Sequence, residues 1–286
     1  MKKLILSILA VMAAFGTFTA AQAGTITVKG SDTLVILAQK WAETYMGKNQ
    51  NVKIQVTGGG SGVGFAALQN KATDLADASR KIKAEEVAEC IKAFGKRPTE
   101  YKVALDGLAV YVSTDNPVKE LTIEQLALIF TGKTKNWKAV GGPDAPITVY
   151  SRENSSGTYE FFKENVLGGK DFTSRAQTMP GTAAVLQAVS KDKNGIGYGG
   201  SAYGAGAKAL AIKKDDSSPA ILPNEETVVG GTYPIWRYLY VYVNPSLDKG
   251  DVAAYLTWIR SDAGQAIVKD IGYFPLPKAF RSNSGQ

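Results

Sequence analysis

The feature that most constrains this 286-residue chain is an alternation of short β-rich runs with helical runs, joined by glycine- and serine-rich loops. Val52 to Val56 alternates apolar and polar residues with the period of a strand, whereas Leu34 to Met46 repeats apolar residues with the period of a helix. Strands are predicted at 25–28, 52–56, 74–77, 103–112, 146–151, 196–199 and 238–243, and helices at 34–46, from 83, 123–130, 159–166, 182–189 and 252–259. The alternation predicts an α/β fold, in which ligands gather beyond the carboxyl ends of the strands.

Three of the loops share a composition suited to anions. Residues 30–33, 60–62 and 155–158 are rich in glycine, serine and threonine, and each loop opens a predicted helix. A helix start leaves backbone N–H groups unpaired and carries partial positive charge, so it binds phosphate or sulfate well. One such loop is usually only a helix cap, but three that each follow a predicted strand favour a shared anion site. Arg152 ends a strand four residues before Ser156, and its guanidinium offers paired donors to an oxyanion.

The composition excludes most enzyme chemistry. The chain has no histidine, which removes the commonest general base and metal ligand, and its one cysteine, Cys90, can form neither an internal disulfide nor a metal cluster. Residues 60–62 resemble a nucleophile turn, yet no Ser-x-x-Lys pattern supplies a base there and no Gly-Lys-Ser/Thr follows. The net charge of +7 is spread among acidic residues without a basic block, which argues against nucleic acid as a partner.

The first 23 residues have the pattern of a secretory signal. Lys2 and Lys3 precede an apolar run over residues 4–15, and Ala21-Gln22-Ala23 offers small residues at the cleavage positions. The run is shorter than the roughly 20 residues that a spanning helix needs. We therefore expect residues 1–23 to be a cleaved signal peptide. Because no cysteine lies near the cleavage site, we expect a periplasmic protein without a lipid anchor.

No internal repeat or low-complexity linker divides the remaining chain. Two apolar strands, near Leu108 and near Tyr240, are suited to cross between two lobes. The expected organisation is a discontinuous first lobe, residues 24–108 and 240–286, and a second lobe, residues 109–239.

The chain resembles the PstS-type phosphate-binding proteins of bacterial phosphate ABC importers. The matching stretches cover nearly the whole chain after residue 23, and the most specific is Ser-Arg-Glu-Asn-Ser-Ser-Gly-Thr-Tyr-Glu-Phe-Phe at 151–162; the others are 29–34, 57–64, 74–80 and 272–277. The resemblance implies a two-lobed periplasmic binding protein fold of type II, hinged by two crossing strands. It also implies a protein that is not an enzyme, has no metal or cofactor, captures inorganic phosphate and delivers it to the membrane subunits of an importer. We expect a monomer.

The resemblance also implies which residues hold phosphate. Thr33, the backbone at Leu34 and Ser61 would donate from the first lobe. Arg152, Ser156, Gly157 and Thr158 would donate from the second. Neighbours in the same loops complete the predicted phosphate-binding set, namely Ser31, Ser79, Arg80 and Ser155.

Two positions depart from the pattern of some relatives. Arg80 stands where they carry an aspartate that accepts a proton from phosphate, and Asn154 stands where an aspartate braces the arginine. Asp77 and Asp32 are the candidate replacements for the missing acceptor, although a cap or a partner for Arg80 or Arg152 is the more ordinary role for each. Two other readings stay open. One is a binding protein for another oxyanion such as sulfate, arsenate, molybdate or tungstate, and the other is a sensory or adhesive protein that retains the fold alone.

Overall fold

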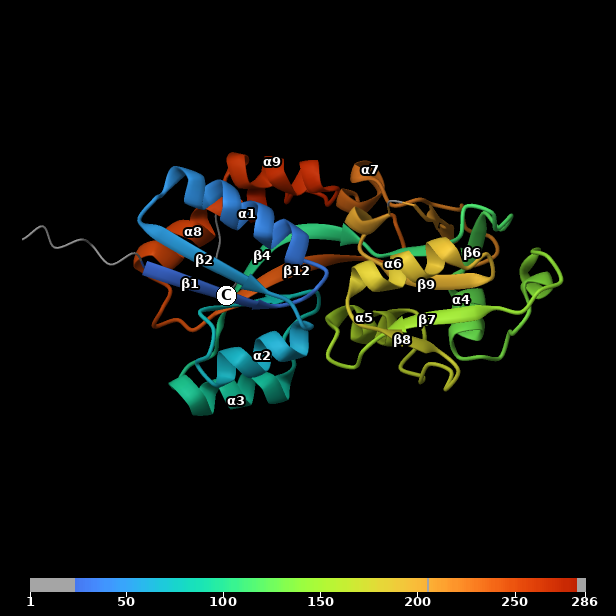
Figure 1. Ribbon diagram of the computed structural model, residues 1–286, viewed down its shortest axis with the longest axis horizontal. Helices are drawn as coiled ribbons and strands as arrows, with labels where there is room; N and C mark the ends of the chain where they lie inside the picture. The colour runs from blue at the N-terminus through green and yellow to red at the C-terminus, as the bar shows by residue number, and fades with distance from the viewer. Residues whose placement is uncertain (1–23, 205, 282–286) are drawn as a thin grey trace, which may run out of the picture.

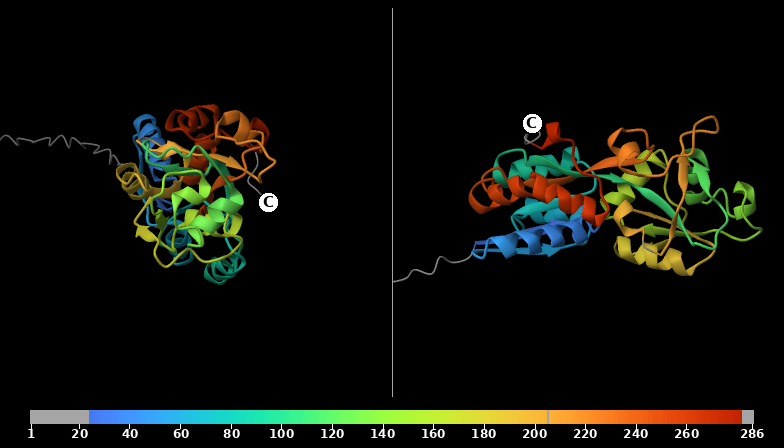
Figure 2. Two further views of the ribbon diagram at one scale, coloured as in Figure 1. Left: turned by 90° about the vertical axis from the view of Figure 1, so that its right-hand side faces the viewer. Right: turned by 90° about the horizontal axis from the view of Figure 1, so that it is seen from above.

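The computed structural model describes residues 24–204 and 206–281. Two lobes lie side by side along the long axis of the molecule, each built on its own five-stranded sheet (Figure 1). The view from above shows the same division, with strands running from one lobe into the other (Figure 2). The predicted signal peptide lies outside the described residues.

The first sheet has the strand order β2-β1-β3-β12-β4. β1 pairs in parallel with β2 and β3, whereas β12 runs antiparallel to both β3 and β4. The strands are β1 Gly24–Gly30, β2 Val52–Thr57, β3 Leu75–Ala78, β4 Thr99–Gly107 and β12 Trp236–Val243. The carboxyl ends of β1, β2 and β3 therefore open at one edge of the sheet, toward the second lobe.

Helices cover both faces of the first sheet. One face packs against α1 Val35–Lys48, α8 Gly250–Arg260 and α9 Asp262–Ile271, and the other against α2 Ser61–Gln69 and α3 Ala84–Phe94. Trp41 of α1 anchors the first face, because its buried indole N–H donates to the carbonyl of Gly264 at 2.8 Å. Cys90 of α3 is fully buried in the second face, as expected for a packing residue.

The second sheet has the order β10-β5-β9-β7-β8. Its strands are β5 Ala109–Val112, β7 Thr148–Arg152, β8 Gln177–Met179, β9 Gly195–Gly199 and β10 Lys208–Ala209. The remaining elements of this lobe are α4 Ile123–Phe130, α5 Gly157–Asn165, α6 Thr182–Lys191, α7 Glu225–Val229 and a small sheet of β6 Glu120–Thr122 and β11 Ala211–Lys213. Phe130, Phe162 and Tyr198 pack ring against ring in the core between the sheet and helices α4 and α5.

The chain passes between the two sheets at two places. β4 ends at Gly107 in the first sheet and β5 begins at Ala109 in the second, with only Leu108 between them. The second connection returns through residues 231–235 into β12. The prediction of one strand over 103–112 was therefore wrong, since these residues belong to two strands of two different sheets. The predicted α/β, two-lobed architecture with crossing strands is confirmed.

Among the residues that the structure describes, no helix has both the length and the apolar composition needed to cross a bilayer.

Candidate functional site

Four buried hydroxyl groups meet where the first lobe faces the start of α5. Each of the four residues is 1% exposed or less, and they are Thr33 after β1, Ser61 at the start of α2, Ser79 after β3 and Thr158 in the first turn of α5. We call these residues the hydroxyl cluster. Thr158 Oγ1 lies 2.6 Å from Thr33 Oγ1 and 3.3 Å from Ser79 Oγ. Ser61 Oγ accepts from the N–H of Ser79 at 3.0 Å, so the loops after three parallel strands are tied to one point.

Arg237 is the cation that contacts the hydroxyl cluster. It lies in the crossing strand β12 and is only 4% exposed. Its Nη2 donates to Thr158 Oγ1 at 3.1 Å, and its Nη1 donates to the carbonyl of Ser79 at 3.0 Å. Two further donations, from Nε and Nη2 at 3.0 and 2.8 Å, go to Oδ2 of Asp106 in β4, which is 0% exposed. Asp106 therefore holds the guanidinium against the cluster across the two crossing strands.

Arg237 was not among the site residues predicted from the sequence. The signal was present, because Asp106 interrupts an otherwise apolar run and Arg237 precedes an alternating aromatic strand. A charge inside a buried strand requires a partner, since an unpaired buried charge is strongly destabilising. The partner could not be identified from the sequence, because the pairing of β12 with β4 brings together residues 131 positions apart.

The start of α5 comes very close to the first lobe. Ser156 caps this helix, with its Oγ accepting from the N–H groups of Thr158 and Tyr159 at 3.2 Å. The next residue, Gly157, has no room for a side chain: a Cβ there would lie 2.3 Å from Ser61 Oγ and 2.8 Å from Ser79 Oγ. The N–H of Gly157 has no acceptor within its own helix. Glycine therefore allows the positive end of α5 to approach the hydroxyl cluster.

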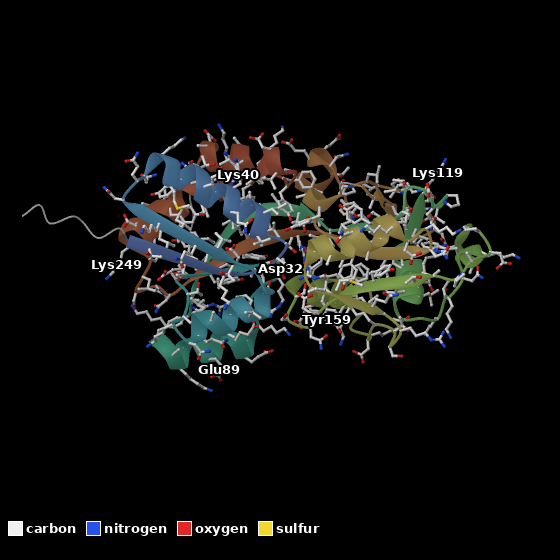
Figure 3. All side chains as sticks on the ribbon, in the orientation of Figure 1. Asp32, Lys40, Glu89, Lys119, Tyr159 and Lys249 are labelled. Atoms are coloured by element: carbon white, nitrogen blue, oxygen red, sulfur yellow. The ribbon has the colours of Figure 1, made fainter. Side chains whose placement is uncertain are left out.

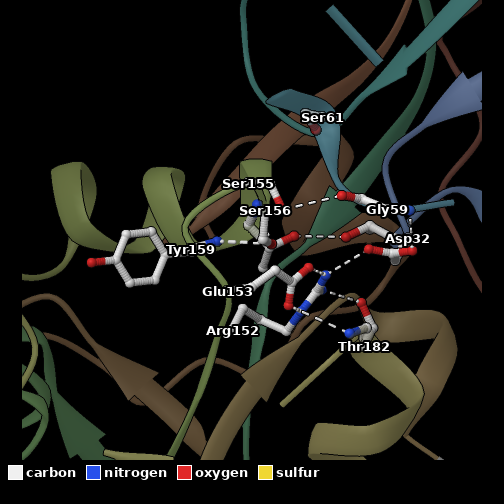
Figure 4. Close-up of polar contacts among 12 residues, drawn as sticks. Asp32, Gly59, Ser61, Arg152, Glu153, Ser155, Ser156, Tyr159 and Thr182 are labelled. Atoms are coloured by element: carbon white, nitrogen blue, oxygen red, sulfur yellow. Dashed lines mark hydrogen bonds and ion pairs between the residues drawn. The ribbon is translucent and has the colours of Figure 1, made fainter. Parts of the chain in front are cut away.

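Arg152 lies beside this point but is engaged by other groups (Figure 4). Its Nη2 donates to Asp32 Oδ2 at 2.8 Å, its Nη1 donates to Thr182 Oγ1 at 2.8 Å, and Glu153 accepts from Nε and Nη2. Burial alone would raise the pKa of Glu153, but the hydrogen bonds and charge of Arg152 hold that pKa below its ordinary value. The ion pair with Asp32 joins the second lobe to the first.

Arg80 is directed away from the hydroxyl cluster, contrary to its predicted place among the phosphate-binding residues. Its guanidinium forms two hydrogen bonds of 2.7 Å with Glu86 of α3 and lies 3.4 Å from Glu160 of α5. The Phe65 ring packs below it, with the guanidinium carbon 4.9 Å from the ring centroid. The position beside Ser79 suggested a ligand contact from the sequence, but the carboxylates of Glu86 and Glu160 hold the Arg80 guanidinium instead.

The other predicted residues shape the loops. The N–H of Leu34 donates to the carbonyl of Ser31 at 3.0 Å, so it is used within the turn before α1. Ser31 itself donates its N–H to the carbonyl of Asp77 at 2.9 Å. Ser155 joins the lobes, because its Oγ donates to the carbonyl of Gly59 at 3.1 Å and its carbonyl accepts from Gly62 at 2.9 Å. These contacts hold the three helix starts together.

The two candidate acceptors for a phosphate proton have different surroundings. Asp32 is the partner of Arg152 and also accepts from the N–H of Gly59 at 2.8 Å, which is the ordinary role that the sequence allowed. Asp77 is 4% exposed at the end of β3, and burial raises its pKa to about 8. Asp106 uses one carboxylate oxygen for Arg237 and the other for the N–H of Ser201. Within the described residues, no hydrogen bond joins any carboxylate to the hydroxyl cluster.

The arrangement is suited to bind an oxyanion. Hydroxyl groups rotate to donate, the start of α5 contributes partial positive charge, and Arg237 contributes a full charge in a site removed from water. Clusters of three or more His, Cys, Asp or Glu side chains able to hold a metal are absent from the part of the chain that the structure describes.

Known proteins share both the sequence and the fold. Residues 17–263 match the model of the PBP superfamily domain. The chain is 37% identical over 270 residues to the phosphate-binding protein PstS of Pseudomonas aeruginosa, covering 89% of this chain and 84% of that protein. It is 34% identical over 283 residues to protein SphX of Synechococcus elongatus, covering 92% of this chain and 83% of that protein.

A solved structure matches closely as well. A putative phosphate ABC transporter substrate-binding protein with bound phosphate from Clostridium perfringens superposes with a TM-score of 0.81 at 28% identity, covering 89% of this chain and all of that one. An ABC-type phosphate transport receptor from Vibrio cholerae gives a TM-score of 0.70 at 26% identity, covering 88% of this chain and all of that one.

The fold and the site together define a two-lobed, non-enzymatic solute-binding protein of the PBP superfamily. Within that class, the chain belongs to the PstS family of phosphate-binding proteins.

Proposed function

We propose that this protein captures inorganic phosphate between its two lobes and delivers it to the membrane subunits of an ABC importer. The observation that carries the proposal is the convergence of four buried hydroxyls and the Arg237 guanidinium at the start of α5. Every member of this group is a hydrogen-bond donor, and the groups come from both lobes and from a crossing strand. An anion held there contacts both lobes at once. The names of the relatives support phosphate as that anion.

The proposed contacts with phosphate differ from the set predicted from the sequence. Thr33, Ser61, Ser79, Thr158 and the N–H of Gly157 supply uncharged donors, and Arg237 supplies the charge. Their hydrogen bonds replace the hydration shell of the dianion, and a charged partner strengthens each bond to the oxyanion. The residues that shape the loops or join the lobes keep supporting roles, and these are Ser31, Leu34, Arg80, Arg152, Ser155 and Ser156.

Capture requires that the lobes open and close. We propose residues 24–108 with 240–286 as one lobe and residues 109–239 as the other, with the crossing segments at Leu108 and in β12 as the hinge. A ligand shifts this equilibrium only through contacts that the closed form makes and the open form lacks. Contacts from Thr158 and Gly157, opposite those from Thr33 and Ser61, meet that requirement.

Location and assembly follow from the same role. We propose a periplasmic protein that is released by cleavage after residue 23, has no lipid anchor and works as a monomer. Phosphate and the importer are its proposed partners, and nucleic acid is not one. A monomer suits a protein whose two lobes must move freely.

A second oxyanion remains an alternative because of one feature of the site. A carboxylate that accepts the proton of hydrogen phosphate rejects sulfate, which has no proton to donate and leaves the acceptor unpaired. In the described residues, Asp106 uses both oxygens elsewhere and Asp32 is engaged by Arg152. The hydroxyl cluster alone is suited to sulfate as well as phosphate.

Competition binding separates these alternatives. Protein stripped of ligand by unfolding and refolding is equilibrated with radiolabelled phosphate, and unlabelled phosphate, sulfate, molybdate and tungstate are added in turn. The proposal predicts displacement by phosphate at concentrations at least about tenfold lower than by any other oxyanion, a difference of ~1.4 kcal/mol. Displacement by sulfate or molybdate at lower concentration than phosphate would assign the site to that anion instead.

A further inference from the structure

A second group of charges, separate from Arg152 and Asp32, joins the two lobes. Glu160 in the first turn of α5 forms ion pairs with Lys83 and with Arg80, the latter at 3.4 Å from Arg80 Nε. Arg80 is held in turn by Glu86, and the N–H of Lys83 donates to the same Glu86 carboxylate at 2.9 Å. Arg80 is therefore paired with one carboxylate of its own lobe and one of the other, whereas the Lys83 ammonium is paired with the carboxylate of the other lobe.

Neutralising both cations requires a carboxylate from the second lobe. Arg80 and Lys83 carry two positive charges, whereas Glu86 supplies one negative charge within the first lobe. Glu160 supplies the second negative charge only when α5 lies against the first lobe. The Glu160 and Arg80 side chains are 23% and 8% exposed, so solvent screens the pair less than it screens surface charges. Burial lowers the pKa of Arg80, but the hydrogen bonds to Glu86 and the charges of Glu86, Glu160 and Glu164 more than offset it and leave that pKa above its ordinary value.

The position of Glu160 connects this group to phosphate. It lies two residues after Thr158 and three after Gly157, so it is within one turn of the helix start that enters the site. Figure 3 shows the neighbouring residue Tyr159 where the two lobes meet. Arg80 and Lys83 line a cavity of about 420 Å³, together with Phe161 of α5 and Trp236 of β12. These two cations therefore lie at the edge of a space between the lobes.

We propose that Glu160, with Arg80 and Lys83, forms an interlobe latch whose positioning role is to hold the start of α5 against the first lobe and so slow the release of bound phosphate. The latch rests on the proposed function for its effect on phosphate, but its effect on closure does not depend on which ligand is bound. It also assigns a role to Arg80, which the sequence analysis had placed in the site.

The first test is a double-mutant cycle with Lys83→Met, Glu160→Gln and the double variant, measured by stopped-flow release of phosphate. Each single variant is expected to speed release about tenfold, which lies in the usual range for coupling between sites, while leaving the association rate nearly unchanged. The double variant is expected to release phosphate little faster than Glu160→Gln, because that variant has already lost the Lys83–Glu160 ion pair. Asp171→Asn is the matched control. It removes the ion pair between Asp171 and Lys163 of α5, and both residues of this pair lie within the second lobe.

A second readout does not require phosphate binding. Spin labels at Lys53→Cys and Lys170→Cys, one in each lobe and with Cys90→Ser, report the distance between the lobes by pulsed electron paramagnetic resonance. Glu160→Gln is expected to shift the distance distribution toward longer values in ligand-free protein, whereas Asp171→Asn is not. Equal distributions for the two variants, or additive effects in the cycle, would overturn the latch. Failure of the wild-type protein to bind phosphate would contradict the proposed function and leave the distance measurement to decide on the latch.

Discussion

At the scale of single residues, Arg237 and Asp106 form a buried ion pair on the two crossing strands. The pair joins β4 to β12, and it also holds a positive charge against the hydroxyl cluster. Breaking a buried pair by removing one partner costs about 3–5 kcal/mol, because the remaining charge is left without a counter-charge.

We expect Arg237→Gln to lower both the free energy of unfolding and the phosphate affinity. The loss of stability should be about 3–5 kcal/mol, and the loss of affinity about 10- to 100-fold, as for a charge-assisted hydrogen bond. In the variant Arg237→Gln with Asp106→Asn, stability should recover in part while affinity stays low. Urea unfolding and calorimetry separate the two effects, and recovery of both together would contradict the role in binding.

Asp77 gives a prediction about pH. Its pKa is raised by burial from 3.8 to about 8, so the folded protein retains a proton that the unfolded chain releases between these values. Stability from this group is therefore fully present below pH ~4 and falls as the pH rises toward 8. Asp77→Asn cannot ionise, and we expect it to be more stable than wild type at pH 7 by no more than about 4 kcal/mol, at ~1.4 kcal/mol per pH unit. Thermal unfolding at pH 5 and pH 8 checks this, and an equal difference at both values would contradict it.

Residue roles could be predicted where they depend on local sequence. The hydroxyl residues Thr33, Ser61 and Thr158 were found because a helix start has a local signature, and the hydroxyl cluster brings them together. Arg80 was predicted to bind phosphate, but its side chain pairs with Glu86 and Glu160, and no local pattern reveals that pairing.

At the scale of elements, the start of α5 is the part of the second lobe that contacts the hydroxyl residues of the first lobe. Ser156 fixes the helix start through two backbone N–H groups, and Gly157 lets it approach the first lobe. The helix itself does not require glycine at its first position, so the role of this residue is the close approach.

We expect Gly157→Ala to weaken phosphate binding at least about 100-fold while leaving the protein folded. The added Cβ would occupy the space 2.3 Å from Ser61 Oγ, which prevents full closure, whereas alanine favours the helix. Gly47→Ala in α1 is the control, because a Cβ there meets nothing within 4 Å. Near-wild-type affinity of Gly157→Ala would show that the start of α5 does not meet the ligand.

Most elements could be predicted from periodicity and loop composition. The helix predicted at 123–130 has the bounds of α4, and the helix predicted at 34–46 is α1 with its start one residue and its end two residues later. The division of residues 103–112 into β4 and β5 could not be predicted, because a buried strand has the same sequence pattern in either sheet. Helix α9, Asp262–Ile271, was not predicted, although Ser261 caps its start and its apolar residues recur with helical spacing.

At the scale of the whole molecule, both ion-pair groups that join the lobes flank the same site. One group is Asp32 with Arg152, and the other is Glu160 with Lys83 and Arg80. The two-lobed fold could be predicted because the family pattern extends over nearly the whole chain. The position of one lobe relative to the other could not be predicted, because contacts such as that of Thr33 with Thr158 depend on the hinge rather than on either lobe.

We expect phosphate to compact the ligand-free protein in solution. Binding favours the form in which both lobes contact the anion, so the radius of gyration from small-angle X-ray scattering should fall when phosphate is added. Sulfate at the same concentration serves as the comparison. An unchanged radius with saturating phosphate would mean that capture does not require closure.

The central claim is that the protein binds one phosphate between its lobes. Calorimetric titration of the ligand-stripped mature protein with phosphate, followed by sulfate, tests it most directly at neutral pH. The account predicts one-to-one binding of phosphate with a dissociation constant of about 1 μM or below and weaker binding of sulfate. A folded protein that releases no heat with phosphate and binds none in dialysis would contradict the account.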